Sequence, residues 1–422
     1  MMTAAATDKL YRRDAYLRRF EARVVAVEGP RVALDRTAFY AGGGGQPPDR
    51  GTLAGAAVVE VGEAAGGVVW HDLGGAGAAA AAAPLPATGA EVLGEVDWAR
   101  RFDHMQQHTG QHVLSAAAIA VLGAGAETVS FHLGPETCTI DLARGPLSDA
   151  EVAAVEEAAQ RVLFEDREVR VAFHRPDEAG ALGLRKPPAW EVVGADLRVV
   201  TVDGLDVSAC GGTHVRRTGE IGALKVVGQE KAKGRARLHF VCGWRAVRAH
   251  GRAHATASAL AARLTCAVPE LAAAVERLDG ERRAALEDAS ALAERLEEGL
   301  AVELAVAAAA GLPPRVVARR LGPGDAGDPG RLAARVLALE PGAVLVLGET
   351  RDGRGQVVLA RREGPVARAA PDLAAVLRAA LAPLGGKGGG RPHFARGTVA
   401  TEDLDRAMVA AASLARGPDD VQ

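Results

Sequence analysis

Two short histidine- and cysteine-bearing segments have the residue types and spacing of a metal site. RFDHMQQHTGQH places histidines at 104, 108 and 112, and CGGTH places Cys210 four residues before His214. Residues four apart on a helix project from one face, while the Gly-Gly spacer of CGGTH indicates a turn. One HxxxH pair and one CxxxH pair can converge on a tetrahedral Zn²⁺. We therefore predict that His108, His112, Cys210 and His214 bind zinc, with His104 one turn earlier as a supporting residue.

A purely structural role is the alternative for these residues. His108 and His112 would then be polar residues at a helix edge, and Cys210 a small buried hydrophobe. That alternative leaves unexplained why Cys210 is followed by Gly-Gly-Thr, which makes a poor core.

Composition excludes several classes of protein. A chain of 422 residues suffices for roughly two to four domains, and a net charge of −3 excludes a uniformly basic nucleic-acid binder, so RNA contact needs a local patch. No apolar run of about 20 residues is free of charges or glycines, and the N-terminus lacks a signal-peptide core. The four scattered cysteines form no disulfide framework. We expect a reduced, cytoplasmic protein that does not span a membrane.

The elements that must position the candidate ligands follow from periodicity and turn residues. A helix predicted over 97–122 carries the HxxxH pair and ends before Gly123. Residues 18–72 contain short apolar or alternating runs typical of strands. The glycine-rich stretch 37–51, TAFYAGGGGQPPDRG, interrupts them as a loop. It is either the backbone-lined wall of a pocket or a plain hairpin connection. Residues 74–90 are predicted to be a low-complexity loop insertion.

Two basic segments are candidates for phosphate contact. A hairpin predicted over 224–243 and a glycine-rich stretch at 385–397, GGKGGGRPHFARG, both combine backbone turns with cationic side chains. The alternatives are a solvated hairpin tip and a flexible loop before the last helix. The candidate residues are Lys231, Lys233, Arg235, Lys387 and Arg391.

Residues 245–310 are predicted to be helical, with apolar residues at alternating spacings of four and three. This pattern is typical of a helical arm or short coiled coil that serves docking or dimerisation. An amphipathic helix packed on its own chain is the alternative. The apolar positions include Leu271, Val275, Leu278, Ala285, Ala289, Leu292 and Leu296.

Several of these segments together resemble one family. TAFYAGGGGQPPDRG, HTGQH and SACGGTHVRRTGEIG resemble the editing domain of alanyl-tRNA synthetase and the free-standing AlaX trans-editing proteins. GGKGGGRPHFARG resembles the DHH-associated C-terminal domain of the synthetase and of the longer AlaX proteins. The resemblance covers nearly the whole chain in the same order. Ala41 and Gly42 depart from the family, which usually has a Pro and an acidic residue there.

The resemblance implies a zinc hydrolase that removes serine or glycine wrongly attached to tRNA(Ala). It places the zinc ligands on the four residues chosen from spacing. It implies that Thr37 discriminates serine from alanine and that Gln46 belongs to the same pocket loop. No stretch before Thr37 resembles a class II aminoacylation core, so the expected action is in trans.

Three other functions are alternatives to this one. A non-catalytic tRNA-binding module with a structural zinc fits four closed ligands. A DHH-class phosphoesterase needs an Asp-rich metal motif, which Asp103-His104 does not supply. A threonyl-tRNA editing domain shares the HxxxH and CxxxH layout, but the GGGQ loop and C-terminal glycine motif favour the alanine system.

The expected fold is α+β in four parts. They are a small N-terminal β-barrel over 1–95, a two-layer α/β zinc-bearing editing domain over 96–247, a helical arm over 248–312, and a C-terminal α/β domain over 313–422. The expected partner is tRNA(Ala), with a homodimer formed through the arm or the C-terminal domain.

Overall fold

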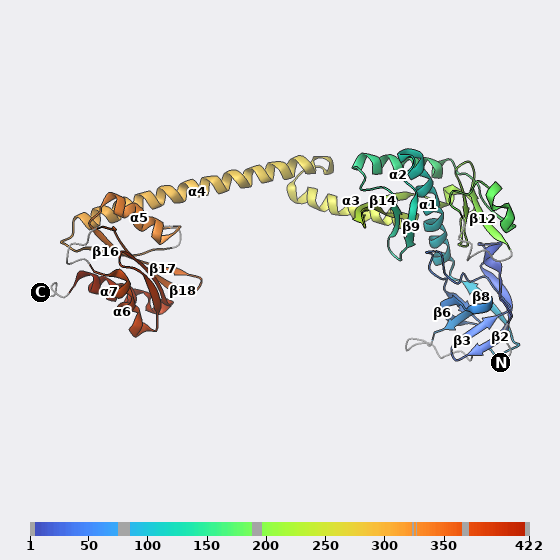
Figure 1. Ribbon diagram of the computed structural model, residues 1–422, viewed down its shortest axis with the longest axis horizontal. Coiled ribbons are helices and arrows are strands. Elements are labelled where there is room, and N and C mark those ends of the chain that lie inside the picture. The colour runs from blue at the N-terminus through green and yellow to red at the C-terminus, as the bar shows by residue number, and fades with distance from the viewer. Residues whose placement is uncertain are drawn as a thin grey trace. The chain divides into compact units, whose positions relative to one another are not determined.

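The computed structural model describes residues 5–74, 85–187, 196–322, 325, 327–364 and 371–417. The chain divides into two compact units, 1–260 and 261–422 (Figure 1). It is a mixed α/β protein with a closed six-stranded barrel in unit 1 and an α/β domain in unit 2. Most of the low-complexity stretch predicted at 74–90 lies outside the described residues.

A small barrel forms the N-terminal part of unit 1. Its closed strand order is β2 (Arg19–Glu28), β3 (Arg31–Leu34), β7 (Val69–Leu73), β6 (Ala56–Glu63), β5 (Gly51–Leu53) and β8 (Glu91–Val96). Burial alternates along β8 because successive side chains point to opposite faces of a strand. The predicted strands in 18–72 are confirmed. The short strand β1 (Asp8–Lys9) pairs in parallel with β4 (Arg36–Thr37), which begins the glycine-rich loop.

Helix α1 (Trp98–Leu122) is the central element of unit 1, and its bounds confirm the predicted helix. Asp97 caps its N-terminus, and Gly123, with a φ of 79°, follows its last residue. It packs with α2 (Asp149–Phe164) against a four-stranded sheet ordered β14 (Leu224–Ala232), β15 (Arg235–Cys242), β10 (Cys138–Leu142) and β9 (Thr128–Leu133). A three-stranded sheet joins β11 (Val169–His174), β12 (Leu197–Val202) and β13 (Asp206–Ala209).

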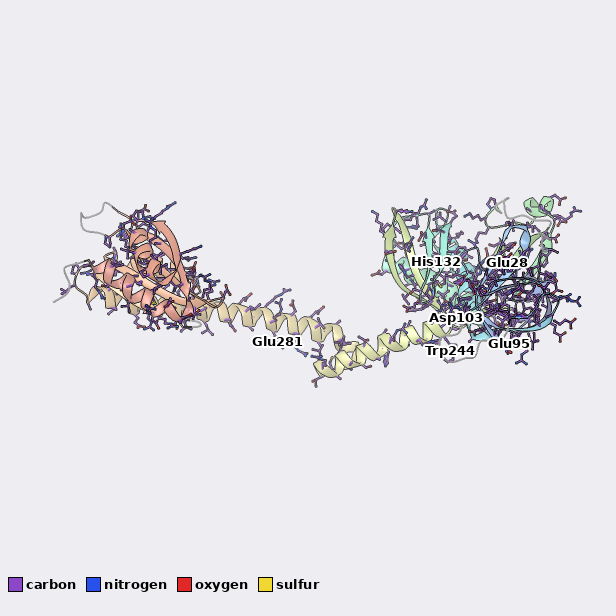
Figure 2. All side chains as sticks on the ribbon, turned by 90° about the horizontal axis from the view of Figure 1, so that it is seen from below. Glu28, Glu95, Asp103, His132, Trp244 and Glu281 are labelled. Carbon is purple, nitrogen blue, oxygen red and sulfur yellow. The ribbon has the colours of Figure 1, made fainter. Side chains whose placement is uncertain are left out.

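Helix α3 (Trp244–Leu264) follows β15, and its first residue, Trp244, is 67% exposed (Figure 2). Helix α4 (Leu271–Ala309) carries the predicted apolar stripe. Four of its members, Val275, Leu278, Leu292 and Leu296, are 51–61% exposed. Packing of the stripe on its own chain stays open as the alternative. Dimerisation through this arm stays a prediction. Among the described residues, no single helix has the length and apolarity to cross a membrane, although the bent pair 244–264 and 268–309 passes that test by length and composition.

Unit 2 has helices on both faces of a mixed sheet ordered β16 (Arg315–Arg320), β17 (Ala343–Arg351), β18 (Arg354–Arg361), β20 (Phe394–Ala400) and β19 (Lys387–Arg391). Helices α6 (Leu373–Leu381) and α7 (Leu404–Arg416) cover one face, while α4 and α5 (Pro329–Leu339) cover the other. Strand β17 is apolar in consecutive positions because both of its faces are buried.

The glycine-rich stretch at 385–397 forms an edge hairpin, so the predicted loop conformation is wrong for it. Phosphate contact by Lys387 and Arg391 stays a prediction. Strand β19 pairs with β20 from Lys387 to Arg391. A Cβ on Gly388 would lie 2.9 Å from Leu377 Cδ2 on α6 and 2.9 Å from Gly397 Cα. Gly388 is needed here because helix α6 packs directly on the strand backbone.

Candidate metal centre

The structure brings the four predicted ligands together. His108 and His112 are buried in the middle of α1, and Cys210 and His214 follow strand β13. One donor atom from each lies within 4.8 Å of the other three. Cys210 Sγ is 3.4 Å from His108 Nε2 and 3.3 Å from His214 Nε2. Two atoms bonded to one tetrahedral Zn²⁺ at about 2.0–2.3 Å stand roughly 3.3–3.7 Å apart, so these donors have suitable spacing.

His104 lies outside this group of four. It is 3% exposed, and within the described part of the chain its Nδ1 has no hydrogen-bond partner. Burial lowers the pKa of His104 to about 4 and keeps the ring neutral. Its supporting role stays a prediction.

Gln46 fixes the tautomer of His108. The Oε1 atom of Gln46 accepts the backbone N–H of Thr213 at 3.0 Å, while its Nε2 donates to Thr213 Oγ1 at 2.8 Å. The same Oε1 lies 2.7 Å from His108 Nδ1. Because Oε1 is an acceptor, Nδ1 must carry the proton, and His108 Nε2 presents a lone pair to the centre. The loop that supplies Gln46 is therefore a wall of this site.

Thr109 fixes the tautomer of His214. Its hydroxyl donates to Met105 O at 2.9 Å, so its oxygen can only accept from other partners. It accepts the backbone N–H of Val215 at 3.2 Å and lies 3.2 Å from His214 Nδ1. His214 Nδ1 must donate, which leaves Nε2 unprotonated toward Cys210.

Asp206 orients the remaining histidine. Its Oδ2 lies 2.8 Å from His112 Nδ1, and Arg185 Nε and Ser208 Oγ donate to the same carboxylate at 2.6 and 2.9 Å. Burial raises the pKa of Asp206, but these contacts outweigh burial and lower the pKa to about 2. A carboxylate behind a histidine is the usual outer support of a metal ligand.

The charges of the centre call for a cation. Burial by itself would raise the pKa of the Cys210 thiol, but His108 and His214 together bring it well below its usual value. Asp206 is a second anion. In the metal-free protein, burial lowers the pKa of His112, but Asp206 and Cys210 outweigh that effect and raise it to about 9. Binding of Zn²⁺ would displace that proton from His112, and three imidazole nitrogens with a thiolate are a donor set that Zn²⁺ prefers.

Two glycines of the motifs are required by packing. A Cβ on Gly212 would lie 2.2 Å from His108 Cε1 and 2.8 Å from Gln46 Oε1. A Cβ on Gly110, within HTGQH, would lie 2.3 Å from Cys242 Sγ. Both positions admit only hydrogen because a neighbouring side chain occupies the space.

Thr37 is fully buried at the end of β4, with its Oγ1 2.8 Å from His71 Nε2. His71 Nδ1 lies 3.1 Å from the carbonyl of Val32, so Nδ1 carries the proton and Nε2 accepts the Thr37 hydroxyl. The Phe39 N–H donates to Thr37 Oγ1 at 3.1 Å. Thr37 therefore retains one lone pair and can act toward a further group only as an acceptor.

The predicted phosphate-contacting residues occupy exposed positions in both units. One set surrounds the β14–β15 turn, where Lys233 has a φ of 51°, and the other lies on β19. None of them forms an ion pair with another described residue. The exposed residues are Lys231, Lys233, Arg235, Lys387 and Arg391.

Sequence reasoning missed the groups behind the ligands. Asp206 precedes Cys210 by four residues, Thr109 follows His108 directly, and Arg185 lies far from both. The only sequence signal was the polar character of DGLDVSACGGTH and HTGQH. Which polar residue faces which histidine depends on how β13 packs against α1.

Comparison with known proteins places these elements in a family context. Residues 197–239 match the family described as threonyl and alanyl tRNA synthetase second additional domain. Residues 314–416 match the DHHA1 domain. The first match contains Cys210 and His214, and the second contains the sheet of unit 2.

Whole-protein relatives agree with the domain matches. The chain is 32% identical over 287 residues to the alanyl-tRNA editing protein Aarsd1 of Rattus norvegicus, covering 64% of this chain and 67% of that protein. It is 35% identical over 409 residues to the alanine–tRNA ligase of Pyrobaculum calidifontis, covering 93% of this chain and 42% of the ligase. For the ligase of Pyrococcus abyssi, identity is 36% over 249 residues, 57% of this chain and 26% of the ligase. The chain thus spans less than half the length of these two ligases.

Proposed function

The chain belongs to the family of alanyl-tRNA editing proteins, and on that premise we propose that it hydrolyses the ester between a wrongly attached serine or glycine and tRNA(Ala), acting in trans. The proposal includes a Zn²⁺ held by His108, His112, Cys210 and His214. The observation that carries it is the convergence of these donors from segments 102 residues apart, with each histidine oriented by its own acceptor.

Hydrolysis of the ester breaks the bond between the carbonyl carbon and the ribose oxygen. Water adds its hydroxyl to that carbon, and a proton goes to the ribose oxygen. Zn²⁺, when bound, supplies polarisation of an oxygen ligand or a lowered pKa for bound water. The residues of the chain supply a preformed site: Gln46, Thr109 and Asp206 hold the three rings in place before any ligand arrives.

Selection of serine is assigned to Thr37 in this proposal. The His71 contact orients the Thr37 hydroxyl so that its oxygen can accept a hydrogen bond from the hydroxyl of serine. Alanine has no such donor. A site that is built around a substrate hydroxyl discriminates well against an analogue that lacks it.

The proposed partner is tRNA(Ala), met by the exposed cations of the β14–β15 turn and of β19. A homodimer through the α4 arm or the C-terminal domain is also proposed, since the apolar stripe on α4 is exposed. The protein is expected to act in the cytoplasm.

Deacylation of Ser-tRNA(Ala), Gly-tRNA(Ala) and Ala-tRNA(Ala) in parallel tests the function. We expect fast loss of serine or glycine, slow loss of alanine, and loss of activity in Cys210→Ala and after chelation. Equal rates for all three substrates, or activity that survives both treatments, would contradict the proposal.

A non-catalytic tRNA-binding module with a structural zinc is the second candidate. The observation in its favour is that four protein donors already complete a tetrahedral site, whereas catalytic zinc usually keeps one open position. Tight binding of tRNA with no hydrolysis of any of the three substrates would establish this second function.

A further inference from the structure

Unit 1 has a cavity of about 600 Å³ outside the metal centre. It is lined by Asp14, residues 16–19, Glu95 and Arg216. Glu95 is one of the residues labelled in Figure 2. The metal ligands do not line this cavity, and nothing in the proposed chemistry uses it.

Two arginines and two aromatic rings beside this cavity form one column, in which a guanidinium lies over each ring and the two rings are tilted by 51°. Arg216 Cζ lies 3.9 Å from the centroid of the Tyr16 ring. The Tyr16 and Trp98 centroids are 5.3 Å apart, and Arg18 Cζ lies 4.0 Å from the Trp98 ring. The column thus ends in a guanidinium group at each end. Unpaired RNA bases stack on both aromatic rings and guanidinium planes.

The column is held rigidly from behind. The Tyr16 hydroxyl donates to the carboxylate of Glu220 and accepts the backbone N–H of Arg216 at 3.0 Å. Arg101, which is fully buried on α1, donates to the carbonyl of Ala15 at 2.7 Å. A rigid stacking surface loses little conformational entropy when a base binds.

Of the three arginines that line the cavity, only Arg18 has no ion-pair partner within the described part of the chain. Arg216 pairs with Asp14 at 3.3 Å and Arg19 pairs with Glu95 at 2.9 Å. Arg18 is exposed and has no carboxylate within ion-pair distance among the residues that the structure describes. A guanidinium that is stacked on a ring and free at its edge suits a phosphate oxygen.

Residues of the cavity and of its column lie near the metal ligands along the chain of unit 1. Arg216 follows the ligand His214 by two residues, so their Cα atoms are at most about 7 Å apart. Trp98 precedes His108 by ten residues on α1, which is about 15 Å along the helix axis. Each of these two residues therefore lies within about 15 Å of a ligand, the length of about four stacked nucleotides at roughly 3.4 Å each.

We propose that this cavity binds the unpaired 3′ nucleotides of a tRNA that precede the aminoacylated terminal one. A base continues the column on a guanidinium plane, and Arg18 holds the adjoining phosphate. The inference rests on the proposed function for the identity of the RNA, but it assigns a site and a contact that the hydrolysis itself does not require.

Equilibrium binding tests this site with two RNAs, deacylated tRNA(Ala) and the same tRNA lacking its unpaired 3′ nucleotides. The wild-type protein should bind the intact tRNA more tightly. Arg18→Ala should weaken binding of the intact tRNA about tenfold, leave binding of the truncated tRNA unchanged, and lower the slope of log Kd against log salt by about one. Arg31→Ala is the matched control, because Arg31 also lies over a tryptophan, Trp70, at 5.3 Å.

The outcomes separate this inference from the proposed function. If Arg18→Ala weakens both RNAs equally, or neither, the cavity does not bind the 3′ nucleotides. A wild-type protein that prefers intact tRNA through Arg18 but hydrolyses no ester would keep the cavity assignment and refute the hydrolase. A protein that hydrolyses Ser-tRNA(Ala) but binds both RNAs with equal affinity would support the hydrolase and refute the cavity assignment.

Discussion

Gly212→Ala is the sharpest test of the metal centre because it adds one methyl group at a defined place. The new Cβ would lie 2.2 Å from His108 Cε1 and 2.4 Å from His108 Nδ1. Ordinary contact begins near 3.4 Å, so the imidazole must withdraw by about 1.2 Å. Gln46 Oε1, at 2.8 Å from the added atom, must move as well, so the support of His108 is lost together with its position.

Metal sites tolerate ligand displacements of about 0.2 Å, and supporting contacts alone change metal affinity by about 10–100-fold. We therefore expect Gly212→Ala to weaken zinc binding by about 100-fold and to reduce deacylation accordingly. Competition with a chromophoric chelator measures the affinity, and thermal unfolding monitors the fold.

Gly211→Ala is the matched control, since a Cβ there would meet nothing within 4 Å. It should keep wild-type zinc affinity. Equal affinities for the two variants, or a folded Gly212→Ala protein that binds zinc like the wild type, would refute the arrangement of His108 and Gln46 described above.

Three further perturbations have defined outcomes. Asp206→Asn should lower zinc affinity about 10–100-fold in the chelator assay, whereas Asp203→Asn, which breaks only an exposed pair with Arg170, should not. Thr37→Val should narrow the ratio of serine to alanine deacylation about two- to tenfold, and an unchanged ratio counts against its role. Burial lowers the pKa of His71 from 6.5 to about 4. The contribution of neutral His71 to the free energy of unfolding is therefore complete above pH 6.5 and is lost as the pH falls toward 4. His71→Phe should remove about 3 kcal/mol of that pH dependence from the free energy of unfolding, and identical pH profiles would contradict the burial argument.

Features of the metal centre that depend on local spacing were predictable from sequence. The helix at 97–122 has a capping aspartate, a glycine after its last residue, and histidines spaced four residues apart. Each of these features acts within one or two helical turns. The capping box of α2, from Ser148 to Glu151, is likewise local. Choosing the four ligands needed only the assumption that two pairs of donors converge.

Features that depend on packing were not predictable in the same way. The stretch at 385–397 has the composition of a loop, but Gly388 and Gly397 allow α6 to pack closely on an edge hairpin. No local sequence pattern predicts that α6 and this hairpin lie in contact. Asp206 is one acidic residue among 53 Asp and Glu, and only the packing of β13 against α1 selects it as the partner of His112.

The residues between the ligands in each motif also have structural roles in the metal centre. In HTGQH, Thr109 orients His214 from the other motif, and Gly110 leaves room for Cys242. In CGGTH, Gly212 leaves room for His108, and Thr213 holds the Gln46 amide that orients it. Each motif therefore supports a ligand supplied by the other, so neither half is fully oriented alone. For this reason the paired motifs are a far stronger signal than either HxxxH or CxxxH by itself.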